Sequence, residues 1–490
     1  MHTIRGSSKS LTRFIPVRPT NLQKTLATLS NSQQEDTIGM TVPATTTTTT
    51  TTTTTNSPPC TTSLPKKLAG RDLYNAIGKP KTIVAPMVDQ SELAWRILSR
   101  KYGADLCYTP MFHARLFVTS EKYRKSMFND QDGNPKYDRP LIVQFCANDP
   151  EILLQAAKLV ENQCDAVDLN LGCPQGIAKK GKYGSFLMED WDLIHKLIGN
   201  LHDNLSIPVT AKIRVYDDYE KSLKYAQMVL NAGAQFLTVH GRTREMKGQN
   251  TGLASWKILR YLRDKLPQSQ VFFSNGNILY ANDLKRCREE TNCDAVMSAE
   301  GNLYNPGVFW TKTDDIDMQF PRVDKILREY FEIVKSVDPH PASRHSMKSH
   351  FFKLMHEFLN VRTELRPMIG RTSVHSSFDE WEKIVEEVER IVEKEVLTMD
   401  NFGELDVVVD GELQVWGGHY KTVPYWRCQP FFRKVDGERQ NTRLLKVAGE
   451  SDLMVTSNEA KEKLLKRELE VEGEGEGEEE DGAARKKIAT

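Results

Sequence analysis

Eight short apolar stretches recur through the middle of this chain, and helical stretches lie between them. The stretches that we expect to form strands are 81–88, 104–111, 141–147, 166–173, 208–215, 235–242, 271–278 and 295–302. Strands that are apolar throughout are typical of parallel sheets, because helices cover both of their faces. Eight such units within about 225 residues match the size of a closed (β/α)8 barrel, and a doubly wound sheet is the alternative.

The strand pattern ends near residue 318, and helical periodicity replaces it. The sequence therefore predicts an α/β protein, in which a (β/α)8 TIM barrel precedes a small all-α helical domain and both ends are disordered extensions. The expected parts are an N-terminal extension with a threonine tract (1–70), the catalytic barrel (71–318), the helical domain (319–400), a C-terminal extension with a short ordered segment (401–435) and a charged tail (436–490).

The two ends of the chain have compositions that cannot build a core. The segment 1–34 lacks Asp and Glu but contains several Arg and Lys residues, threonines fill 45–55, and the far end is an acidic run with a short basic patch. The N-terminal composition fits a mitochondrial transit peptide, and it fits a disordered basic tail equally. We expect a cytoplasmic or nuclear protein, with mitochondrial import through the acid-poor N-terminus as the alternative.

Composition excludes several classes of protein. Lys+Arg and Asp+Glu each total 66, so the net charge gives no indication of a partner. The eight cysteines are scattered, with no C-x-x-C pair and no zinc-ligand spacing. This predicts reduced thiols, no disulfide framework and no metal site. No apolar run approaches the ~18 residues that a membrane helix needs, so we expect no membrane association.

One cysteine directly follows the fourth predicted strand, in the segment NLGCPQGIAKKGKYGSFL at 170–187. In barrels, chemistry takes place where the strands end at the C-terminal face. A thiol there could be a buried filler, a metal ligand, a nucleophile or an acid that donates a proton. The residues that stand late in the predicted strands, and could share this site, are Met87, Gln144, Asn170, Cys173, Lys212, Arg214, His240, Arg242, Asn275 and Glu300.

Two cations stand two residues apart on the fifth predicted strand, so both point to one side. Lys212 and Arg214 are costly to bury without an anionic partner. A phosphate, or a ring that becomes anionic on reduction, would supply one, and an ion pair at the barrel rim is the alternative. His240 and Arg242 follow at the next strand end, where we expect contact with the same ligand.

Turns that contain glycine follow the seventh and eighth strands, at 275–277 and 299–301. In (β/α)8 barrels, these two loops commonly hold a phosphate through backbone N–H groups. A G-x-G-x-x-G motif after a strand is absent, so we expect a nicotinamide nucleotide to bind only transiently at the barrel mouth. The pattern predicts a compact, phosphate-bearing cofactor.

Charge is segregated within the helical part. Between residues 344 and 371, six Lys or Arg and three His residues stand against Glu357 and Glu364, and the next helix is acidic. A basic helical face beside a barrel mouth suits the phosphate backbone of a nucleic acid. A solvated helix with ordinary salt links is the alternative.

Six motifs closely resemble those of the tRNA-dihydrouridine synthase family, whose members are FMN-dependent barrels with a helical C-terminal domain. The motifs lie within 78–400 and are APMV, VQFCAND, DLNLGCPQ with YGSFL, AKIRV, VHGRTREMKG and SNGNI. The lysine-rich segment after Cys173 and PYWRCQPFFRK at 424–434 resemble the eukaryotic branch that acts on uridines 16 and 17 of the tRNA D-loop. The spacing CPQGIAKKGKYG departs mildly from the family pattern.

The resemblance implies FMN as the cofactor, NADPH or NADH as the reductant, tRNA as the partner and Cys173 as the catalytic acid. The residues that it implies for flavin binding are Pro86, Met87 and Val88 on one face, Gln144 at the pyrimidine edge, Lys212 near N1 and O2, His240, and, at the phosphate end, Asn275, Gly276, Asn277, Ala299 and Glu300. The residues expected to contact the tRNA are Asn170, Lys179, Lys180, Lys182, Arg214, Arg242, Arg344, Lys348, Arg362 and Arg366.

The resemblance also gives the thiol a reaction. Hydride should add to C6 of uracil, because the charge then delocalises onto O4, and C5 is left needing a proton. A thiol with a pKa near ~8.5 is still protonated at neutral pH, whereas a carboxylate is already ionised. We expect a monomeric enzyme that reduces the C5=C6 bond of tRNA uridine. An FMN-dependent barrel that reduces a small molecule, similar to a dihydroorotate dehydrogenase or an enone reductase, is the alternative.

Overall fold

The computed structural model describes residues 67–248, 251–411 and 420–432. The predicted threonine tract, nearly all of the N-terminal extension and the charged tail lie outside these residues, as do parts of the C-terminal extension. No helix within the described ranges is long and apolar enough to span a membrane.

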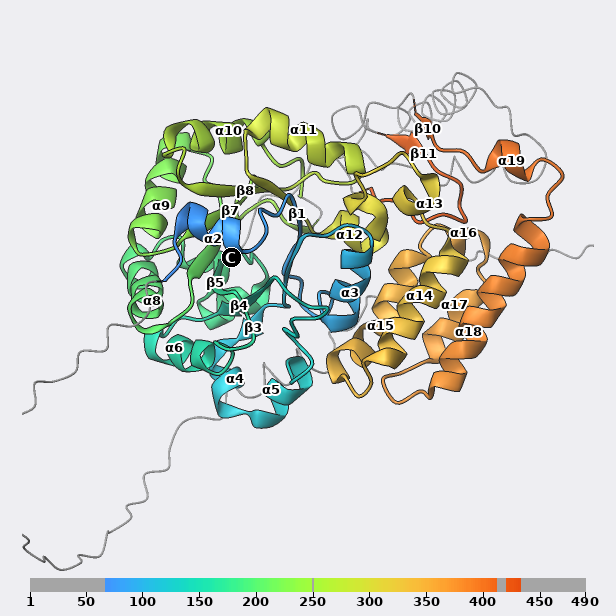
Figure 1. Cartoon of the computed structure of the whole chain (residues 1–490), viewed down its shortest axis with the longest axis horizontal. Helices are drawn as coiled ribbons and strands as arrows, with labels where there is room; N and C mark the ends of the chain where they lie inside the picture. The colour runs from blue at the N-terminus through green and yellow to red at the C-terminus, as the bar shows by residue number, and fades with distance from the viewer. Residues whose placement is uncertain (1–66, 249–250, 412–419, 433–490) are drawn as a thin grey trace, which may run out of the picture. The chain divides into compact units, whose positions relative to one another are not determined.

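Eight parallel strands close into a barrel, which confirms the predicted fold class (Figure 1). β1 pairs with β2 and β9, and β2 also pairs with β4, so the ring has no open edge. A ninth, two-residue strand, β3, adds to β4 and was not expected from the sequence. The strands are β1 (Thr82–Val84), β2 (Leu106–Tyr108), β3 (Phe112–His113), β4 (Leu141–Cys146), β5 (Ala166–Leu171), β6 (Val209–Arg214), β7 (Phe236–His240), β8 (Val271–Asn275) and β9 (Ala295–Ser298).

Helices cover the outside of the barrel, and several begin at a capping side chain. At the start of α6, the Asp149 carboxylate accepts hydrogen bonds from the backbone N–H groups of Glu151 and Ile152. This cap satisfies donors that have no partner inside the helix. The helical elements of the barrel are α2 (Gly70–Ala76), α3 (Leu93–Lys101), α4 (Ala114–Thr119), α5 (Glu121–Met127), α6 (Pro150–Lys158), α7 (Gly176–Gly181), η1 (Gly184–Leu187), α8 (Trp191–Asn204), α9 (Tyr219–Asn231), α10 (Trp256–Lys265), α11 (Ala281–Thr291), α12 (Glu300–Tyr304), η3 (Pro306–Phe309) and α13 (Ile316–Gln319).

The register of the strands brings polar residues together at one end of the barrel. Asn170 of β5 pairs with Lys212 of β6. Arg214, further along β6, pairs with His240 of β7, and His240 pairs in turn with Asn275 of β8. Since all these strands are parallel, these residues all lie toward the C-terminal face of the barrel.

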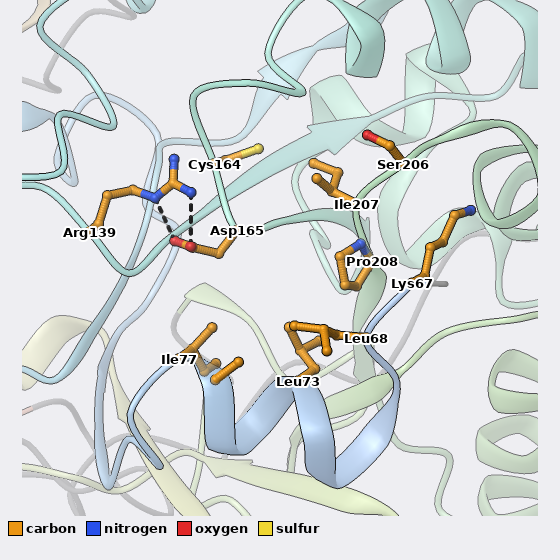
Figure 2. A pocket seen from close by; sticks show the side chains of 11 residues that line it. Lys67, Leu68, Leu73, Ile77, Arg139, Cys164, Asp165, Ser206, Ile207 and Pro208 are labelled. Carbon is orange, nitrogen blue, oxygen red and sulfur yellow. Dashed lines mark hydrogen bonds and ion pairs between the residues drawn. The ribbon is translucent and has the colours of Figure 1, made fainter. Parts of the chain in front are cut away.

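A cavity of about 280 Å³ lies at the opposite, N-terminal end of the strands (Figure 2). Arg139 and Asp165 form an ion pair on one side of it, and Leu73 of α2 and Ile77, the residue after α2, lie across from them (Figure 2). The cavity contains none of the predicted site residues. In barrels of this type the N-terminal face serves stability rather than chemistry, and the functional site lies at the other end.

The helices that follow the barrel share one apolar core with α3. The ring of Trp95 in α3 stacks on that of His350 in α15, with centroids 4.0 Å apart and planes 3° apart. His350 Nε2 lies 3.1 Å from Oε2 of Glu92, the residue that caps α3. The later elements are α14 (Val323–Ser336), α15 (Pro341–Leu354), α16 (Phe358–Val361), α17 (Leu365–Arg371), α18 (Phe378–Ile391), the π-helical turn η4 (Val392–Val396), α19 (Phe402–Leu405), and the strands β10 (Val409–Asp410) and β11 (Lys421–Thr422).

Replacing Trp95 with Ala should lower the free energy of unfolding by about 3–5 kcal/mol, because a fully buried aromatic side chain is removed from the junction. Chemical denaturation followed by circular dichroism measures the change. Tyr219, which is 38% exposed, provides the control, and its replacement with Ala should leave the midpoint almost unchanged. A Trp95 variant that unfolds at the wild-type midpoint would contradict the shared core.

Candidate active site

Cys173 lies half-buried in the loop after β5, and its backbone is held from two sides. The side-chain oxygen of Asn170 accepts hydrogen bonds from the N–H groups of Gly172 (3.1 Å) and Cys173 (2.9 Å). Ser185 donates its N–H (3.1 Å) and its hydroxyl (2.9 Å) to the carbonyl of Cys173. Gly184 makes this approach possible: its φ is +65°, and a Cβ there would lie 2.8 Å from the same carbonyl oxygen. These contacts therefore fix the position of the Cys173 backbone.

Burial raises the pKa of the Cys173 thiol, and the charges of Arg214, Lys212 and Lys247 oppose this rise. The thiol is consequently protonated at neutral pH, which makes it a weak nucleophile and an available proton donor. Within the described residues, no group of three or more His, Cys, Asp or Glu side chains could hold a metal ion. A protonated thiol fits the hypothesis of an acid better than that of a nucleophile.

A chain of buried hydrogen bonds runs from Asn170 across the neighbouring strands. Asn170 Nδ2 donates to Gln144 Oε1, and Gln144 Nε2 donates to Asp168 Oδ2, both at 2.8 Å. Thr210 donates its hydroxyl to Asp168 Oδ1 at 2.7 Å. Burial raises the pKa of Asp168 to about 6. The sequence analysis missed Asp168 and Thr210, although each stands two residues before a predicted site residue on the same strand and therefore shares its side.

Lys212 and Arg214 are buried, and neither forms an ion pair with a carboxylate of the described chain. Lys212 donates to Asn275 Oδ1 (3.1 Å), and Arg214 donates to the carbonyl oxygens of Gly172 (2.7 Å) and Thr243 (2.7 Å). Burial lowers the pKa of Lys212 to about 8 and that of Arg214 to about 10. The sequence analysis gave an ion pair at the barrel rim as the alternative to a ligand, and the described residues do not form such a pair. An anionic ligand would stabilise both charges.

His240 and Arg242 continue the site onto the next loop. Arg242 Nη1 lies 2.9 Å from His240 Nε2, and Arg242 Nη2 donates to Asn277 Oδ1 at 3.0 Å. Burial and the nearby cations lower the pKa of His240 well below its usual value, so its imidazole is neutral. Gly276 has a φ of +120°, and a Cβ there would lie only 2.5 Å from that of Ala254, so the loop packs more closely than another residue would allow.

A cavity of about 260 Å³ opens between the loops that follow β5 to β9. The predicted residues that line it are Arg214, His240, Arg242, Asn275, Gly276, Asn277, Ala299 and Glu300. The predicted residues that do not line it are Pro86, Met87, Val88, Gln144, Asn170, Cys173, Lys212, Lys179, Lys180, Lys182, Arg344, Lys348, Arg362 and Arg366. Lys212 donates a hydrogen bond to Asn275, which does line the cavity. The lining also includes Lys247 and Phe431, which the sequence analysis did not identify as site residues.

The predicted tRNA contacts fall into two groups. Lys179, Lys180 and Lys182 of the loop after Cys173 are exposed to solvent. The four cations of the helical part instead have partners within the chain. Arg344 donates to the carbonyl of Ser376, Lys348 to those of Gly370 and Thr372, Arg362 pairs with Glu395, and Arg366 bonds to Leu359 and Asn360. Among the predicted tRNA contacts, Lys179, Lys180 and Lys182, which we call the lysine loop, are therefore the exposed group.

A closed parallel barrel that gathers buried cations and a thiol at its C-terminal face has the arrangement of a (β/α)8-barrel enzyme. The chain belongs to the dihydrouridine synthase (Dus) family, whose sequence model matches residues 83–398. This finding confirms the resemblance drawn from the motifs.

Named relatives support the same branch of the family. The chain is 61% identical over 385 residues to a tRNA-dihydrouridine(16/17) synthase of Saccharomyces cerevisiae, an alignment that covers 78% of this chain and 90% of the relative. It is 49% identical over 374 residues to the Schizosaccharomyces pombe protein of that name, covering 76% and 92%. Similarity to a human tRNA-dihydrouridine(20a/20b) synthase-like protein is lower, at 38% over 235 residues, covering 47% and 71%.

Cys173 should react with iodoacetamide at pH 7 more slowly than a free cysteine peptide, because burial raises its pKa and only the thiolate attacks. Its rate should still be rising with pH in the region where a free thiol is already fully ionised. Peptide mass spectrometry measures the modification at each cysteine, and Cys173→Ser supplies the blank. Modification at pH 7 as fast as that of the free peptide would contradict a protonated thiol.

Proposed function

We propose that this protein is an FMN-dependent tRNA-dihydrouridine synthase that reduces the C5=C6 bond of uridine 16, uridine 17 or both in the tRNA D-loop, with NADPH or NADH as the reductant. One observation carries the proposal: Cys173, whose backbone Asn170 holds, is close enough to Lys212 and Arg214 to interact with their charges, and these two buried cations have no carboxylate partner among the described residues. Membership of the Dus family and the names of the relatives support the same reaction.

The side chains of the cavity fit FMN. Arg242 and Lys247 line the cavity together with Asn275 and Asn277, a set that suits a phosphate monoester. Lys212, deeper in the barrel, offers a cation for a ring that gathers negative charge, and the amide of Gln144 offers a donor and an acceptor. When it is bound, FMN supplies hydride to the substrate and is reduced again by NAD(P)H.

The cations of the site have a second role toward the thiol. As hydride adds to C6 of the base, the electron pair of the C5=C6 bond takes the proton from Cys173 Sγ and forms the C5–H bond. A thiolate then remains, and the charges of Arg214 and Lys212 stabilise it, since both favour the ionised form of Cys173. Solvent returns the proton. Asn170 and Ser185 keep the sulfur in place during this transfer, because they hold the backbone of Cys173.

A uridine of the D-loop must leave its stack to reach this site, since Cys173 follows β5 at the C-terminal face of the barrel and is partly buried. The exposed Lys179, Lys180 and Lys182 follow Cys173 within one loop, so they would meet the phosphates that flank an extruded base. We therefore propose that this loop makes the first contact with the phosphates of the tRNA.

Cys173→Ala should still accept electrons from NADPH but should form dihydrouridine at least about 100-fold more slowly, because the proton donor is lost. The measurement is anaerobic: the flavin absorbance is bleached with NADPH, D-loop tRNA is added, and reoxidation and dihydrouridine content are followed. Free uridine and orotate serve as comparison substrates. Normal turnover by the variant would place the acid elsewhere, and reoxidation by orotate but not tRNA would favour a small-molecule oxidoreductase.

Replacing Lys179, Lys180 and Lys182 together with Ala should weaken tRNA binding by about tenfold near physiological salt, and should make its salt dependence shallower because fewer counterions are released. Filter binding over a salt series measures both. The matched control replaces three exposed lysines on the outer helices, Lys196, Lys224 and Lys257, and should change neither. An unchanged salt slope in the loop variant would refute its role.

A further inference from the structure

The segment 420–432, which we call the strap, links the last loops of the barrel to the helical part. It lies beyond residue 398, where the match to the Dus family ends. Its Tyr420 and Phe432 pack near Tyr280 of the barrel, and its Tyr425 stacks on Phe358 of α16, with ring centroids 5.9 Å apart. The strap therefore touches both parts of the chain.

Buried polar contacts fix the strap in place. The side chain of Arg427 is only 2% exposed and bonds both carboxylate oxygens of Asp406 (2.6 Å each) and one of Asp317 (2.8 Å). Cys428 is fully buried, and its thiol donates to the carbonyl of Leu354. Breaking such contacts would leave a charge buried and unpaired, so the strap has one well-defined position.

Phe431 lies at the end of the strap and is one of the residues that line the active-site cavity, as Glu300 and Gly301 of α12 are. Its ring stacks on that of Tyr304 with centroids 5.3 Å apart and planes 19° apart. The ring of His356 meets it nearly edge-on, at 5.1 Å and 76°. Two aromatic neighbours from different parts of the chain thus set the plane of Phe431, which remains half-buried at the cavity.

The next residue, Phe432, packs elsewhere. Its ring lies 5.1 Å from that of Tyr420 and 6.4 Å from that of Tyr280, in an apolar cluster with Leu279 and Phe320. It does not line the active-site cavity. The two adjacent phenylalanines therefore have the same chemistry and different surroundings, which makes one the control for the other.

We propose that Phe431 closes the cofactor cavity on the side of α12 and retains the bound flavin, an inference that rests on the proposed function. The ring of Phe431 stacks on Tyr304 of α12, and Glu300 and Gly301 of the same helix line the cavity. Cationic and polar groups line the cavity together with apolar side chains such as Met246, Ile278 and Met297. An apolar ring at its edge displaces water and shields the charges within.

The test compares flavin release from Phe431→Ala, Phe431→Leu, Phe432→Ala and wild-type protein in the full chain. Each is loaded with FMN and diluted, and the rise of flavin fluorescence gives the release rate. We expect release about five- to tenfold faster from Phe431→Ala, a smaller increase from Phe431→Leu, and wild-type release from Phe432→Ala. The Leu variant keeps an apolar contact with Tyr304. It therefore tests whether the Phe431 ring closes the cavity even if the Ala variant folds poorly.

Three results of this experiment would contradict the role proposed for Phe431, and a fourth would contradict the proposed function. Wild-type release rates in both Phe431 variants would overturn the inference, and so would weaker tRNA binding with unchanged flavin release, which would make Phe431 a contact for RNA. Equal effects of Phe431→Ala and Phe432→Ala would also overturn it, because they would mean general loosening of the strap. A wild-type protein that binds no flavin would instead contradict the proposed function itself.

Discussion

The active site depends on a single carboxamide, that of Asn170. Its oxygen holds the N–H groups of Gly172 and Cys173, and its nitrogen donates to Gln144, which is bonded in turn to Asp168. One side chain thereby links the position of the proposed acid to the polar groups inside the barrel. Because Asn170, Gln144 and Asp168 are all buried, the arrangement resists displacement. The hydrogen bonds of Asn170 in the structure position the Cys173 backbone, and its contact with tRNA, expected from the sequence, stays a prediction.

Two buried cations near Asn170 have an unfavourable electrostatic free energy. Lys212 and Arg214 are buried without a carboxylate partner in the described chain, and their lowered pKa values express the cost of keeping them charged. An anionic ligand would relieve that cost, and so would the thiolate formed in the proposed proton transfer. In the proposed mechanism, the same cations therefore serve both ligand binding and proton transfer, and the neutral imidazole of His240 adds no further positive charge.

Much of this site could be predicted, because strand ends converge in a parallel barrel. Once eight strands were assigned, Cys173, Lys212 and His240 had to lie at one face. Other features depend on contacts that sequence spacing does not reveal. In the sequence, Asp168 is a single polar residue within an apolar strand. Its hydrogen bonds with Gln144 and Thr210, which the structure shows, explain why a carboxylate is buried there. Arg362 reads as part of a basic track, whereas folding brings it against Glu395, 33 residues away in sequence.

The sequence by itself determined the alternation of strands and helices, the face of the barrel that carries the chemistry, and the motifs that identify the family. These follow from local periodicity and from residue types at strand ends. Tertiary structure alone decided which cations have internal partners and which side chains wall the cavity. Phe431 stands 258 residues after Cys173, and only the packing of Arg427 and Cys428 against distant helices brings its ring to the site. Such long-range contacts leave no periodic signal, because many combinations of residues can form them.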